Sequence, residues 1–224
     1  MNLYQLAAVV VVSYLIGAIP WGYLMVKVAK HGADIRDFGS HNVGATNVLR
    51  VLGTRAFVAC MFLDAAKGYV PTLAAWYLFH THDMQVAAGI SAVLGHDFPV
   101  YIHFKGGRGV ATSFGVYAAL AFPLAVGMVA VGIFIVLALR YMSVMSMVTV
   151  PGAAIVLLLL AIFHVNDDFT YTKTIFGAFA TFFVLVTHIP NIRRLIQGTE
   201  PRIGESEHRV RAKARRASRK KVHV

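Results

Sequence analysis

The sequence predicts an all-α polytopic membrane protein of about seven transmembrane helices, with its N-terminus outside and its C-terminus in the cytoplasm. Only 14% of the 224 residues are charged and 58% are hydrophobic, whereas about a quarter of the residues of a soluble protein are charged. Three stretches, 1–26, 110–139 and 141–163, contain no charged residue. Because about 20 apolar residues cross the ~30 Å hydrocarbon core of a bilayer, such runs are typical of transmembrane helices.

The first uncharged run predicts a retained helix over 4–26. A cleaved signal peptide is disfavoured, because no basic residue precedes the run and no small-x-small cleavage site follows it. The second helix is predicted over 56–79, where Pro71 is expected to kink it. The third is predicted over 84–98.

The run 110–139 predicts two helices rather than one. A single helix of this length would extend about 45 Å, which is too long for the bilayer core without strong tilt. Phe122-Pro123 also interrupts the run, since proline disfavours helix continuation. Two further helices are predicted over 142–163 and 174–189, which brings the total to seven.

Basic residues set the predicted orientation. By the positive-inside rule, the loop after the first helix lies in the cytoplasm. Seven helices then place Arg140 and the C-terminal residues on that same side, whereas six would leave both outside. We therefore expect a multi-pass inner-membrane protein. The basic residues of the first loop are Lys27, Lys30, Arg36, Arg50 and Arg55.

The chain divides into an integral membrane domain, 1–200, and a basic tail, 201–224. The tail holds nine Lys or Arg against two Glu and has no apolar face. It is expected to be disordered in isolation and to face the anionic cytoplasmic leaflet, and nucleic-acid binding is not expected. The single cysteine, Cys60, excludes an intrachain disulfide and any multi-cysteine metal site.

The first polar segment, 34–50, concentrates small and hydrogen-bonding residues between the first two helices. Its glycines let the backbone approach a ligand closely, and Arg50 can bind an oxyanion through two parallel hydrogen bonds. No Gly-Lys-Ser/Thr ends the segment, which excludes a Walker loop. A helix-capping turn explains the same composition. The residues concerned are Gly39, Ser40, Asn42, Gly44, Thr46, Asn47 and Arg50.

The second polar segment, 95–112, places Lys105-Gly-Gly-Arg-Gly109 directly before a long apolar helix. A helix N-terminus presents free N–H groups and the positive end of a dipole. Two cations and three glycines at this point therefore predict a phosphate cradle. The alternative is an ordinary positive-inside anchor.

Two later segments lie at predicted cytoplasmic helix ends. Arg140 is followed by Ser143 and Ser146, which share one helix face. Hydroxyls that bond back to their own helix are an equal alternative. His188 and Asn191 lie at the cytoplasmic end of the last predicted helix, where an imidazole can act as a general base or complement the helix dipole.

Asp64 and Lys67 lie inside the second predicted helix, at a spacing that lets them pair on one face. Ionisable residues within a membrane span are candidates for function. A structural ion pair that faces the bundle interior is the favoured interpretation, and direct contact with a substrate is the alternative.

These segments together resemble one family closely, the bacterial acyl-phosphate-dependent glycerol-3-phosphate acyltransferases, or PlsY family. Its first motif is matched by Gly39-Ser-His-Asn-Val-Gly-Ala-Thr-Asn47 with Arg50. Its second is matched by Gly95-His-x-Phe-Pro and Phe104-Lys-Gly-Gly-Arg-Gly-Val-Ala-Thr112. Other matches are Asp64-x-x-Lys-Gly68, Arg140-Tyr-x-Ser-x-x-Ser146, and His188-x-x-Asn-Ile-x-Arg-Leu through Gly198-Thr-Glu200. The resemblance extends from about residue 13 to residue 200.

The resemblance implies a reaction. An acyl group would move from acyl phosphate to the 1-hydroxyl of glycerol 3-phosphate, giving lysophosphatidic acid and inorganic phosphate, the first step of phospholipid synthesis. Seven membrane spans are implied, and neither a metal nor an organic cofactor. The expected partners are glycerol 3-phosphate, acyl phosphate and membrane lipids.

The site expected from these motifs has three catalytic residues, Ser40, Arg108 and His188. Either His188 or a substrate phosphate would take the hydroxyl proton. The sequence departs from the family pattern at His41, where a second glycine is usual, and at Arg108, where lysine is usual; arginine keeps the charge but is not equivalent at a fitted site. The expected substrate-binding residues are Asn42, Gly44, Asn47, Arg50, His96, Lys105, Gly106, Gly107, Ser143, Ser146 and Asn191.

Three other functions explain the sequence less well. An acyltransferase of the His-x4-Asp type is disfavoured, because none of the ten histidines has an aspartate five positions later. An anion transporter would suit Asp64 and Lys67, but the repeated halves typical of transporters are not evident. A membrane scaffold with a lipid-binding tail leaves the glycine-rich segments unexplained.

Overall fold

A computed structural model describes residues 2–205, and all regular structure within this range is helical. Most of the predicted basic tail, 206–224, lies outside the described residues. The α-helices are α1 (Leu3–Gly17), α2 (Trp21–Ala29), α3 (Ala45–Leu52), α4 (Thr54–Phe79), α5 (His82–Asp97), α6 (Val110–Leu120), α7 (Phe122–Leu139), α8 (Met142–Ile162), α9 (Tyr171–Thr187) and α10 (Ile189–Ile196). Two short 3₁₀ turns, η1 (Ile35–Asp37) and η2 (Val100–Ile102), lie in the loops.

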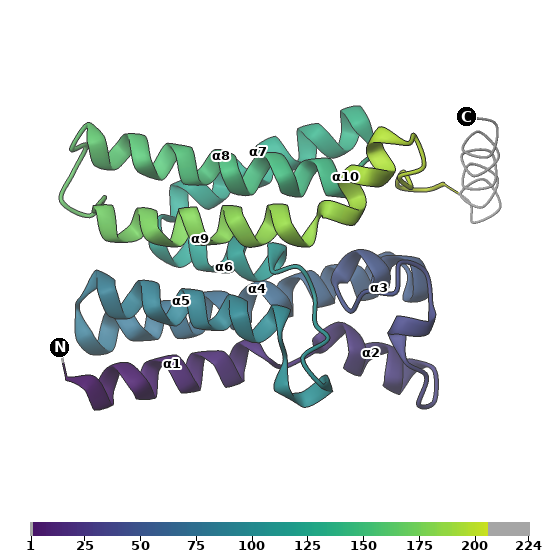
Figure 1. The fold of residues 1–224 in the computed structure, drawn as a ribbon, viewed down its shortest axis with the longest axis horizontal. Coiled ribbons are helices and arrows are strands. Elements are labelled where there is room, and N and C mark those ends of the chain that lie inside the picture. Colours follow the sequence, from purple (N-terminus) through teal and green to yellow (C-terminus); the bar gives the residue numbers. More distant parts are fainter. Residues whose placement is uncertain (1, 206–224) are drawn as a thin grey trace.

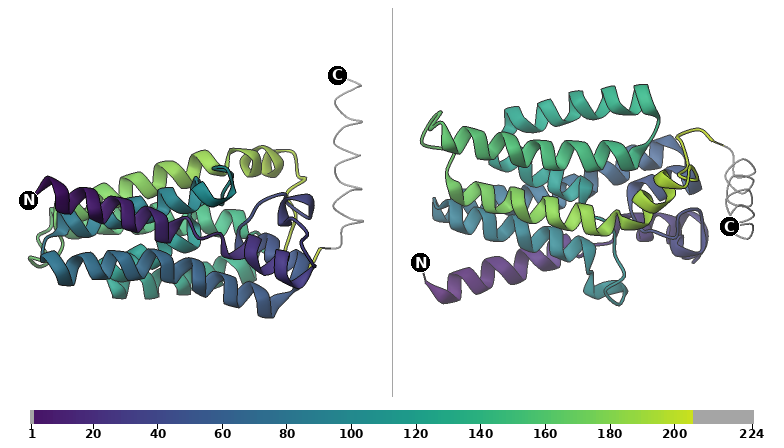
Figure 2. Two further views of the ribbon diagram at one scale, coloured as in Figure 1. Left: turned by 90° about the horizontal axis from the view of Figure 1, so that it is seen from below. Right: turned by 45° about the horizontal axis from the view of Figure 1, so that its top comes forward.

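The long helices form an elongated bundle. In Figure 1, α1 and the helices α4 to α9 run along one common axis, with the start of α1 at one end and α10 at the other. The views in Figure 2 show α2, α3 and α10 at this second end, towards which the polar segments 30–44, 98–109 and 140–141 also lie. We call it the loop end.

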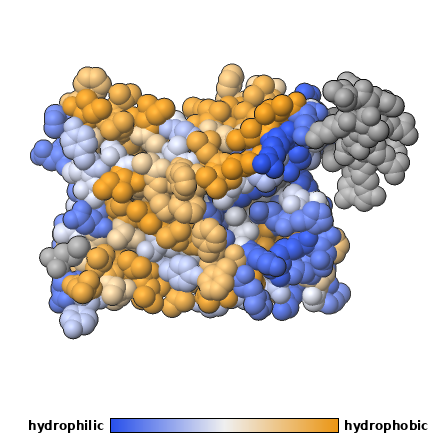
Figure 3. Space-filling model, in the orientation of Figure 1, coloured by the Kyte–Doolittle hydropathy of each residue, from blue (hydrophilic) through white to orange (hydrophobic). Residues whose placement is uncertain are grey.

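Surface polarity follows the same division. On the face shown in Figure 3, hydrophilic residues gather at the loop end and apolar residues cover much of the rest. Within residues 2–205, four helical segments are long and apolar enough to cross a membrane, Leu3–Ala29, α4, α7 and α8, and a fifth is obtained if the bent pair α9–α10 forms one span. The all-α membrane architecture is thus supported, while the number of seven spans stays a prediction, since α5 has 16 residues and α6 only 11.

The uncharged run 110–139 does form two helices, as predicted. Helix α6 ends at Leu120 and α7 begins at Phe122, with Pro123 in its first turn. A proline is tolerated there, because the first N–H groups of a helix have no partner within the helix. The carbonyl groups freed at this break are bound by buried side chains: Lys173 Nζ donates to Leu120 O (2.9 Å) and Gln85 Nε2 to Ala119 O (3.1 Å).

The prediction of one unbroken helix over 4–26 was wrong. The helix stops after Gly17, and α2 begins at Trp21. Pro20 explains the break, because it has no N–H to continue the helical ladder and disfavours helical geometry at the residue before it. The ammonium of Lys67, on α4, donates to the carbonyl oxygen of Ile19 at this break (2.8 Å).

Close helix contacts are made through small residues, as is common in membrane proteins. A Cβ added at Gly17 on α1 would overlap the backbone of Ala92 on α5. Likewise, a Cβ at Gly115 on α6 would overlap the carbonyl oxygen of Ala65 on α4. These approaches fix α1 against α5 and α4 against α6, which are the helices that lead into the polar loops.

Candidate active site

The first polar loop, residues 34–44, is organised by the side chain of Asn47. Its Nδ2 donates to three carbonyl oxygens, those of Ile35 (3.1 Å), Phe38 (2.9 Å) and Asn42 (2.9 Å). Its Oδ1 accepts from the backbone N–H of Ser40 (2.9 Å). Because Asn47 is buried and its amide is fully used within the protein, these contacts favour a role in shaping the loop.

The loop then feeds directly into α3. Asn42 Oδ1 accepts from the N–H of Gly44 (2.8 Å), and Gly44 is the N-cap residue of α3. Arg50 lies in the last turn of α3. Its Cδ comes within 3.5 Å of the position a Cβ would occupy on Gly39, so its side chain runs alongside the loop. The hydroxyl of Ser40 has no hydrogen-bond partner among the described residues.

His41 occupies a position that favours glycine. Its φ of 58° lies in the left-handed region, which explains why a glycine at this point in the family pattern is physically sensible. The strain of this conformation is offset by a hydrogen bond, in which Nδ1 of His41 donates to the carbonyl oxygen of Arg36 (2.7 Å). Histidine is among the residues that tolerate this region better than most.

His41→Gly is therefore expected to change the free energy of unfolding by no more than about 1 kcal/mol. Relief of the left-handed strain, about 1–2 kcal/mol, offsets the lost hydrogen bond, about 1 kcal/mol, and the added entropy of glycine, about 0.5–1 kcal/mol. His41→Val, which keeps the strain and loses the bond, is expected to destabilise by about 2 kcal/mol. Thermal unfolding in detergent compares them, and equal losses in both variants would contradict this explanation.

The second polar loop, residues 98–109, is held against the end of α5. The N–H of Gly106 donates to Asp97 O (3.2 Å) and that of Gly107 to His96 O (3.0 Å). A Cβ at Gly106 would overlap His96 O, and one at Gly107 would overlap the imidazole Nε2 of His96. These glycines thus allow close packing on α5. The expectation that their N–H groups face a phosphate is not met in this structure.

The two loops touch each other. The side chain of Ile102, from the second loop, is buried in an apolar cluster with Val26, Ile35 and Val48 beneath the first loop. Arg36 pairs with Asp34 (2.6 Å) and also donates to the carbonyl oxygen of Ile102 (3.4 Å). Because Arg36 donates to the carboxylate of Asp34, the pKa of Asp34 lies below its usual range.

The C-terminal segment adds a buried carboxylate, Glu200. Glycine at 198 ends α10 in the left-handed conformation (φ 65°) and turns the chain back on the helix. Glu200 Oε1 then accepts from Ser143 Oγ (2.7 Å) and Asn191 Nδ2 (2.6 Å), while Oε2 accepts from Arg194 Nε (2.7 Å). This carboxylate joins the start of α8 to α10. It accepts hydrogen bonds from two of the predicted substrate-binding residues, Ser143 and Asn191.

Glu200→Ala is expected to lower the free energy of unfolding by about 2–3 kcal/mol. The change leaves the buried Ser143 and Asn191 donors without an acceptor and leaves Arg194 unpaired. The control is Asp167→Ala, which removes an exposed carboxylate at the opposite end of the bundle. Thermal unfolding measures both variants, and an unchanged transition in Glu200→Ala would show that the contacts of Glu200 are not needed for stability.

Arg194 contacts this carboxylate, and two further arginines, Arg50 and Arg108, lie within electrostatic range of it. Arg108 interacts electrostatically with Arg194, Glu200 and Arg50, and Arg50 does so with Glu200 and Arg194. Burial, together with Arg194, lowers the pKa of Arg108 from its ordinary value. We call Arg50, Arg108 and Arg194 the arginine group. Three guanidinium groups and one carboxylate leave an excess of two positive charges, which suits a phosphate dianion.

His188 lies beside this group, between α9 and α10. Its Nδ1 donates to the carbonyl oxygen of Val184 (2.8 Å), which leaves Nε2 as the acceptor nitrogen of the ring. Burial and the nearby charge of Arg108 lower the pKa of His188 to about 4. At neutral pH the imidazole is therefore uncharged, with a lone pair on Nε2 that can take a proton.

The remaining predicted residues are placed less directly. Ser146 Oγ donates to Met142 O of its own helix (2.9 Å), the alternative weighed for it from the sequence. Lys105 is exposed, in the second polar loop. His96 is buried beneath Gly107, so its contact with a substrate is not supported by its position.

Two residues of the site were missing from the predicted set, Arg194 and Glu200. The motif Gly198-Thr-Glu200 was noted in the sequence, but no role was derived for its carboxylate. Arg194 and Glu200 form a buried ion pair, which depends on the reversal of the chain at Gly198. Their separation of six residues in the sequence does not by itself indicate this pair.

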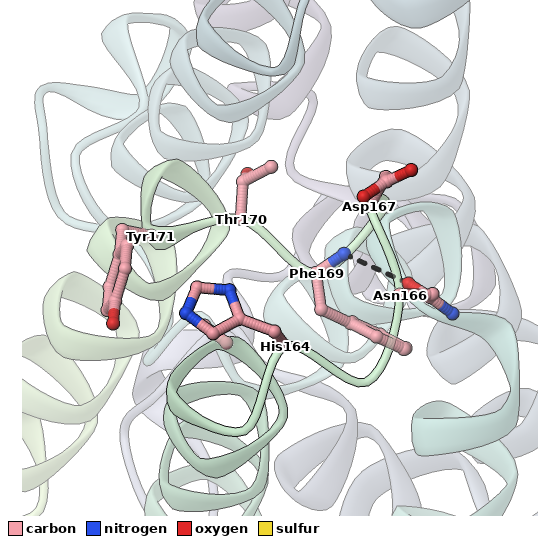
Figure 4. Close-up of a pocket in the computed structure, with 7 residues that line it drawn as sticks. His164, Asn166, Asp167, Phe169, Thr170 and Tyr171 are labelled. Carbon is pink, nitrogen blue, oxygen red and sulfur yellow. Dashed lines mark hydrogen bonds between the residues drawn. The ribbon is translucent and has the colours of Figure 1, made fainter.

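A cavity of about 260 Å³ lies elsewhere, between α8 and α9 at the end opposite the loops. His164, Asn166 and Phe169 line it, with Thr170 and Tyr171 (Figure 4). The figure shows the Asn166 side chain engaged with the backbone N–H of Phe169, so this polar group shapes the turn. None of the predicted site residues lines this cavity.

Comparison with known proteins finds relatives of this chain in sequence and in fold. The glycerol-3-phosphate acyltransferase family profile matches residues 7–198. Glycerol-3-phosphate acyltransferases of Prochlorococcus marinus and Trichlorobacter lovleyi are 38% and 42% identical, over 86% and 84% of this chain and 96% and 92% of theirs. The crystal structure of PlsY, an integral membrane glycerol 3-phosphate acyltransferase, in its glycerol 3-phosphate form superposes with a TM-score of 0.82 at 35% identity, covering 89% of this chain and 96% of that one. Its lysophosphatidic acid form gives a TM-score of 0.79 at 34% identity, covering 89% and 95%.

Proposed function

Because the chain belongs to the glycerol-3-phosphate acyltransferase family of integral membrane enzymes, we propose that its acyl donor is an acyl phosphate and that the acceptor is the 1-hydroxyl of glycerol 3-phosphate. The products are lysophosphatidic acid and inorganic phosphate. The observation that carries the proposal is the arginine group, with its excess positive charge, next to a neutral His188. The glycerol 3-phosphate and lysophosphatidic acid named for the PlsY structures are consistent with it.

Both proposed substrates carry a phosphate, so the site must hold two anions side by side. Arg108 comes from the second polar loop and Arg50 from the last turn of α3, and the two lie within electrostatic range of each other, which lets each bind a separate phosphate. Their charges would also offset the negative charge that develops on the carbonyl oxygen in the transition state. Lys105 remains a proposed phosphate ligand from the second loop.

The reaction itself needs little from the protein beyond positioning. The 1-hydroxyl oxygen attacks the acyl carbon, the bond from that carbon to the phosphate oxygen breaks, and phosphate leaves. The hydroxyl proton passes to Nε2 of His188, which returns it to the departing phosphate. Holding the hydroxyl against the carbonyl can supply roughly 7–11 kcal/mol. Since an acyl phosphate is already activated, the protein needs no covalent intermediate, metal or cofactor.

The other predicted residues fall into two groups under this proposal. Ser40 has an unpaired hydroxyl and is proposed to contact the substrates directly, as a catalytic residue. The second group shapes the site: Asn42, Gly44 and Asn47 fold the first loop, His96, Gly106 and Gly107 fold the second, and Ser143, Ser146 and Asn191 hold the entry to α8 and α10.

The proposed setting is the bacterial inner membrane, with seven spans, the loop end in the cytoplasm and the acyl chain between helices. The basic residues of the first loop support this orientation. The orientation is tested with a Cys60→Ser protein that carries His103→Cys in the second loop. This cysteine is labelled with a membrane-impermeant thiol reagent. Labelling in intact cells, before the membrane is opened, would place the loop end outside.

The test of the donor uses purified wild-type protein with glycerol 3-phosphate and either palmitoyl phosphate or palmitoyl-CoA. We expect phosphate release with palmitoyl phosphate only, matched mole for mole by lysophosphatidic acid. Turnover with palmitoyl-CoA alone would overturn the proposed donor while leaving the acyltransferase assignment in place. Uptake of labelled glycerol 3-phosphate into sealed vesicles without esterification would favour a transporter instead.

A further inference from the structure

An ion pair on α4 is buried inside the bundle, outside the arginine group. Lys67 Nζ lies 2.9 Å from Asp64 Oδ1, and both side chains are only 3% exposed. With so little exposure, neither group is open to a substrate from solution. The favoured interpretation from the sequence, an ion pair facing the bundle interior, agrees with this position. Each member of the pair also makes a second contact, and the two contacts lead in different directions.

Lys67 leads to the first polar loop. Its ammonium donates to Ile19 O (2.8 Å), a carbonyl freed where the first span breaks. Helix α2 starts two residues later, and its Gly22 packs so closely on the carbonyl oxygen of Val43 that a Cβ would overlap it. Val43 lies between Asn42 and Gly44, so the position of α2 sets that of the loop that carries Ser40.

Asp64 leads to the second polar loop. Its Oδ1 lies 3.6 Å from Nδ1 of His96, a buried residue in the last turn of α5. The Nε2 edge of that imidazole lies directly against Gly107, and the backbone carbonyl of His96 accepts the Gly107 N–H (3.0 Å). Arg108 is the next residue. Thus one ring and one carbonyl of His96 hold the backbone from which Arg108 extends.

We propose that the Asp64–Lys67 pair positions the two polar loops relative to each other, and through them the groups that hold the two substrates. The inference rests on the proposed function, because it requires that each loop holds part of the acyl donor and the acceptor. A buried ion pair has a narrow range of geometries, since a displaced charge would lose its partner in a medium of low polarity. Fixing both loops to one pair on a single helix therefore fixes the distance between them. A misplacement of 1 Å in such a site can lower the rate about 100-fold.

The chain offers a matched control at the opposite end. Lys173 is also a buried lysine that donates to a carbonyl at a helix break, Leu120 O (2.9 Å), and it also pairs with an aspartate, Asp168 (2.6 Å), whose side chain is 53% exposed. It leads to the turn between α6 and α7 rather than to a polar loop. If both pairs act only on stability, neither double variant should lower kcat in protein that remains folded, whereas a positioning role lowers kcat through Asp64–Lys67 alone.

The experiment compares the double variants Asp64→Asn/Lys67→Met and Asp168→Asn/Lys173→Met, which remove both charges of a pair so that neither member is left without the other. We expect the two variants to unfold within a few degrees of each other. Asp64→Asn/Lys67→Met should lose about 100-fold in kcat with a smaller change in KM. Asp168→Asn/Lys173→Met should keep kcat within about threefold of wild type. Equal kcat in both variants, or a loss in the first that tracks unfolding, would overturn the proposal.

Wild-type protein is assayed first with both acyl phosphate and acyl-CoA, and the variants are compared on the donor that turns over. A wrong donor assignment is then seen in the wild type. A wrong positioning assignment is seen in the comparison of the two variants, whichever donor the enzyme uses.

Discussion

Arg108→Ala is expected to lower kcat about 1,000-fold while the protein remains folded. Removal of one well-placed donor to a developing negative charge costs about 100- to 1,000-fold in other enzymes, and Arg108 also supplies a full positive charge. Arg108 belongs to a group of three arginines around one carboxylate, Glu200. Its loss therefore halves the excess charge available to the two substrate phosphates.

The measurement is steady-state phosphate release from purified variants, with thermal unfolding as the check on folding. Arg108→Lys is the matched control, because lysine is the usual residue of the family pattern at this position. We expect it to keep turnover within about tenfold of wild type, since the charge remains but the two-pronged geometry is lost. Wild-type kinetics in Arg108→Ala would remove the role assigned to this residue.

His188→Gln is expected to lower kcat by about 100- to 10,000-fold, the usual contribution of a general base. Glutamine can keep a hydrogen bond but cannot take the hydroxyl proton. Thermal unfolding again separates a folded, inactive variant from a destabilised one. If turnover stays within a few-fold of wild type, the proton goes to a substrate phosphate, which was the alternative left open by the sequence.

The pH dependence gives an independent check on the same residue. The neutral imidazole is the form that accepts a proton, and its pKa in the free enzyme is lowered from 6.5 to about 4. The step in kcat/KM that belongs to His188 should therefore lie below pH 6.5, with activity lost as pH falls through it. A step above pH 7 in wild type that disappears in His188→Gln would contradict the lowered pKa.

Much of the helical arrangement could be predicted from the sequence, because charge-free runs identify the apolar helices directly. Helices at 54–79, 142–162 and 171–187 fall within a few residues of the predicted ranges. Pro123 correctly divided the run 110–139. The same reasoning was not applied to Pro20, since an uncharged run of 26 residues is already long enough for one span. Only the structure shows that Lys67 binds the carbonyl left free at that break.

The sequence placed the candidate residues at one end of the bundle, but it did not predict the contacts that they make there. The structure brings Arg50, Arg108, His188 and Asn191 together at the loop end, as their motifs suggested. Sequence alone assigned the N–H groups of Gly106 and Gly107 to a ligand, because a glycine-rich stretch before a helix looks alike whether its N–H groups are free or bound. Their actual partners, carbonyl groups at the end of α5, are set by tertiary packing.

Glu200 shows why the rest could not be predicted. A glutamate in a polar segment next to a basic tail looks solvated in the sequence. It becomes a buried acceptor for three donors only because Gly198 reverses the chain after α10 and brings it against the start of α8. Residues brought together by such a turn are non-local, and no periodicity records them.

The central claim is that the arginine group and His188 form the acyl-transfer site. A crystal structure of this chain with glycerol 3-phosphate tests it most directly. The account predicts phosphate oxygens within about 3 Å of the arginine group, with the 1-hydroxyl directed towards Nε2 of His188. A ligand bound elsewhere, such as in the cavity lined by His164 and Tyr171 at the opposite end, would contradict it.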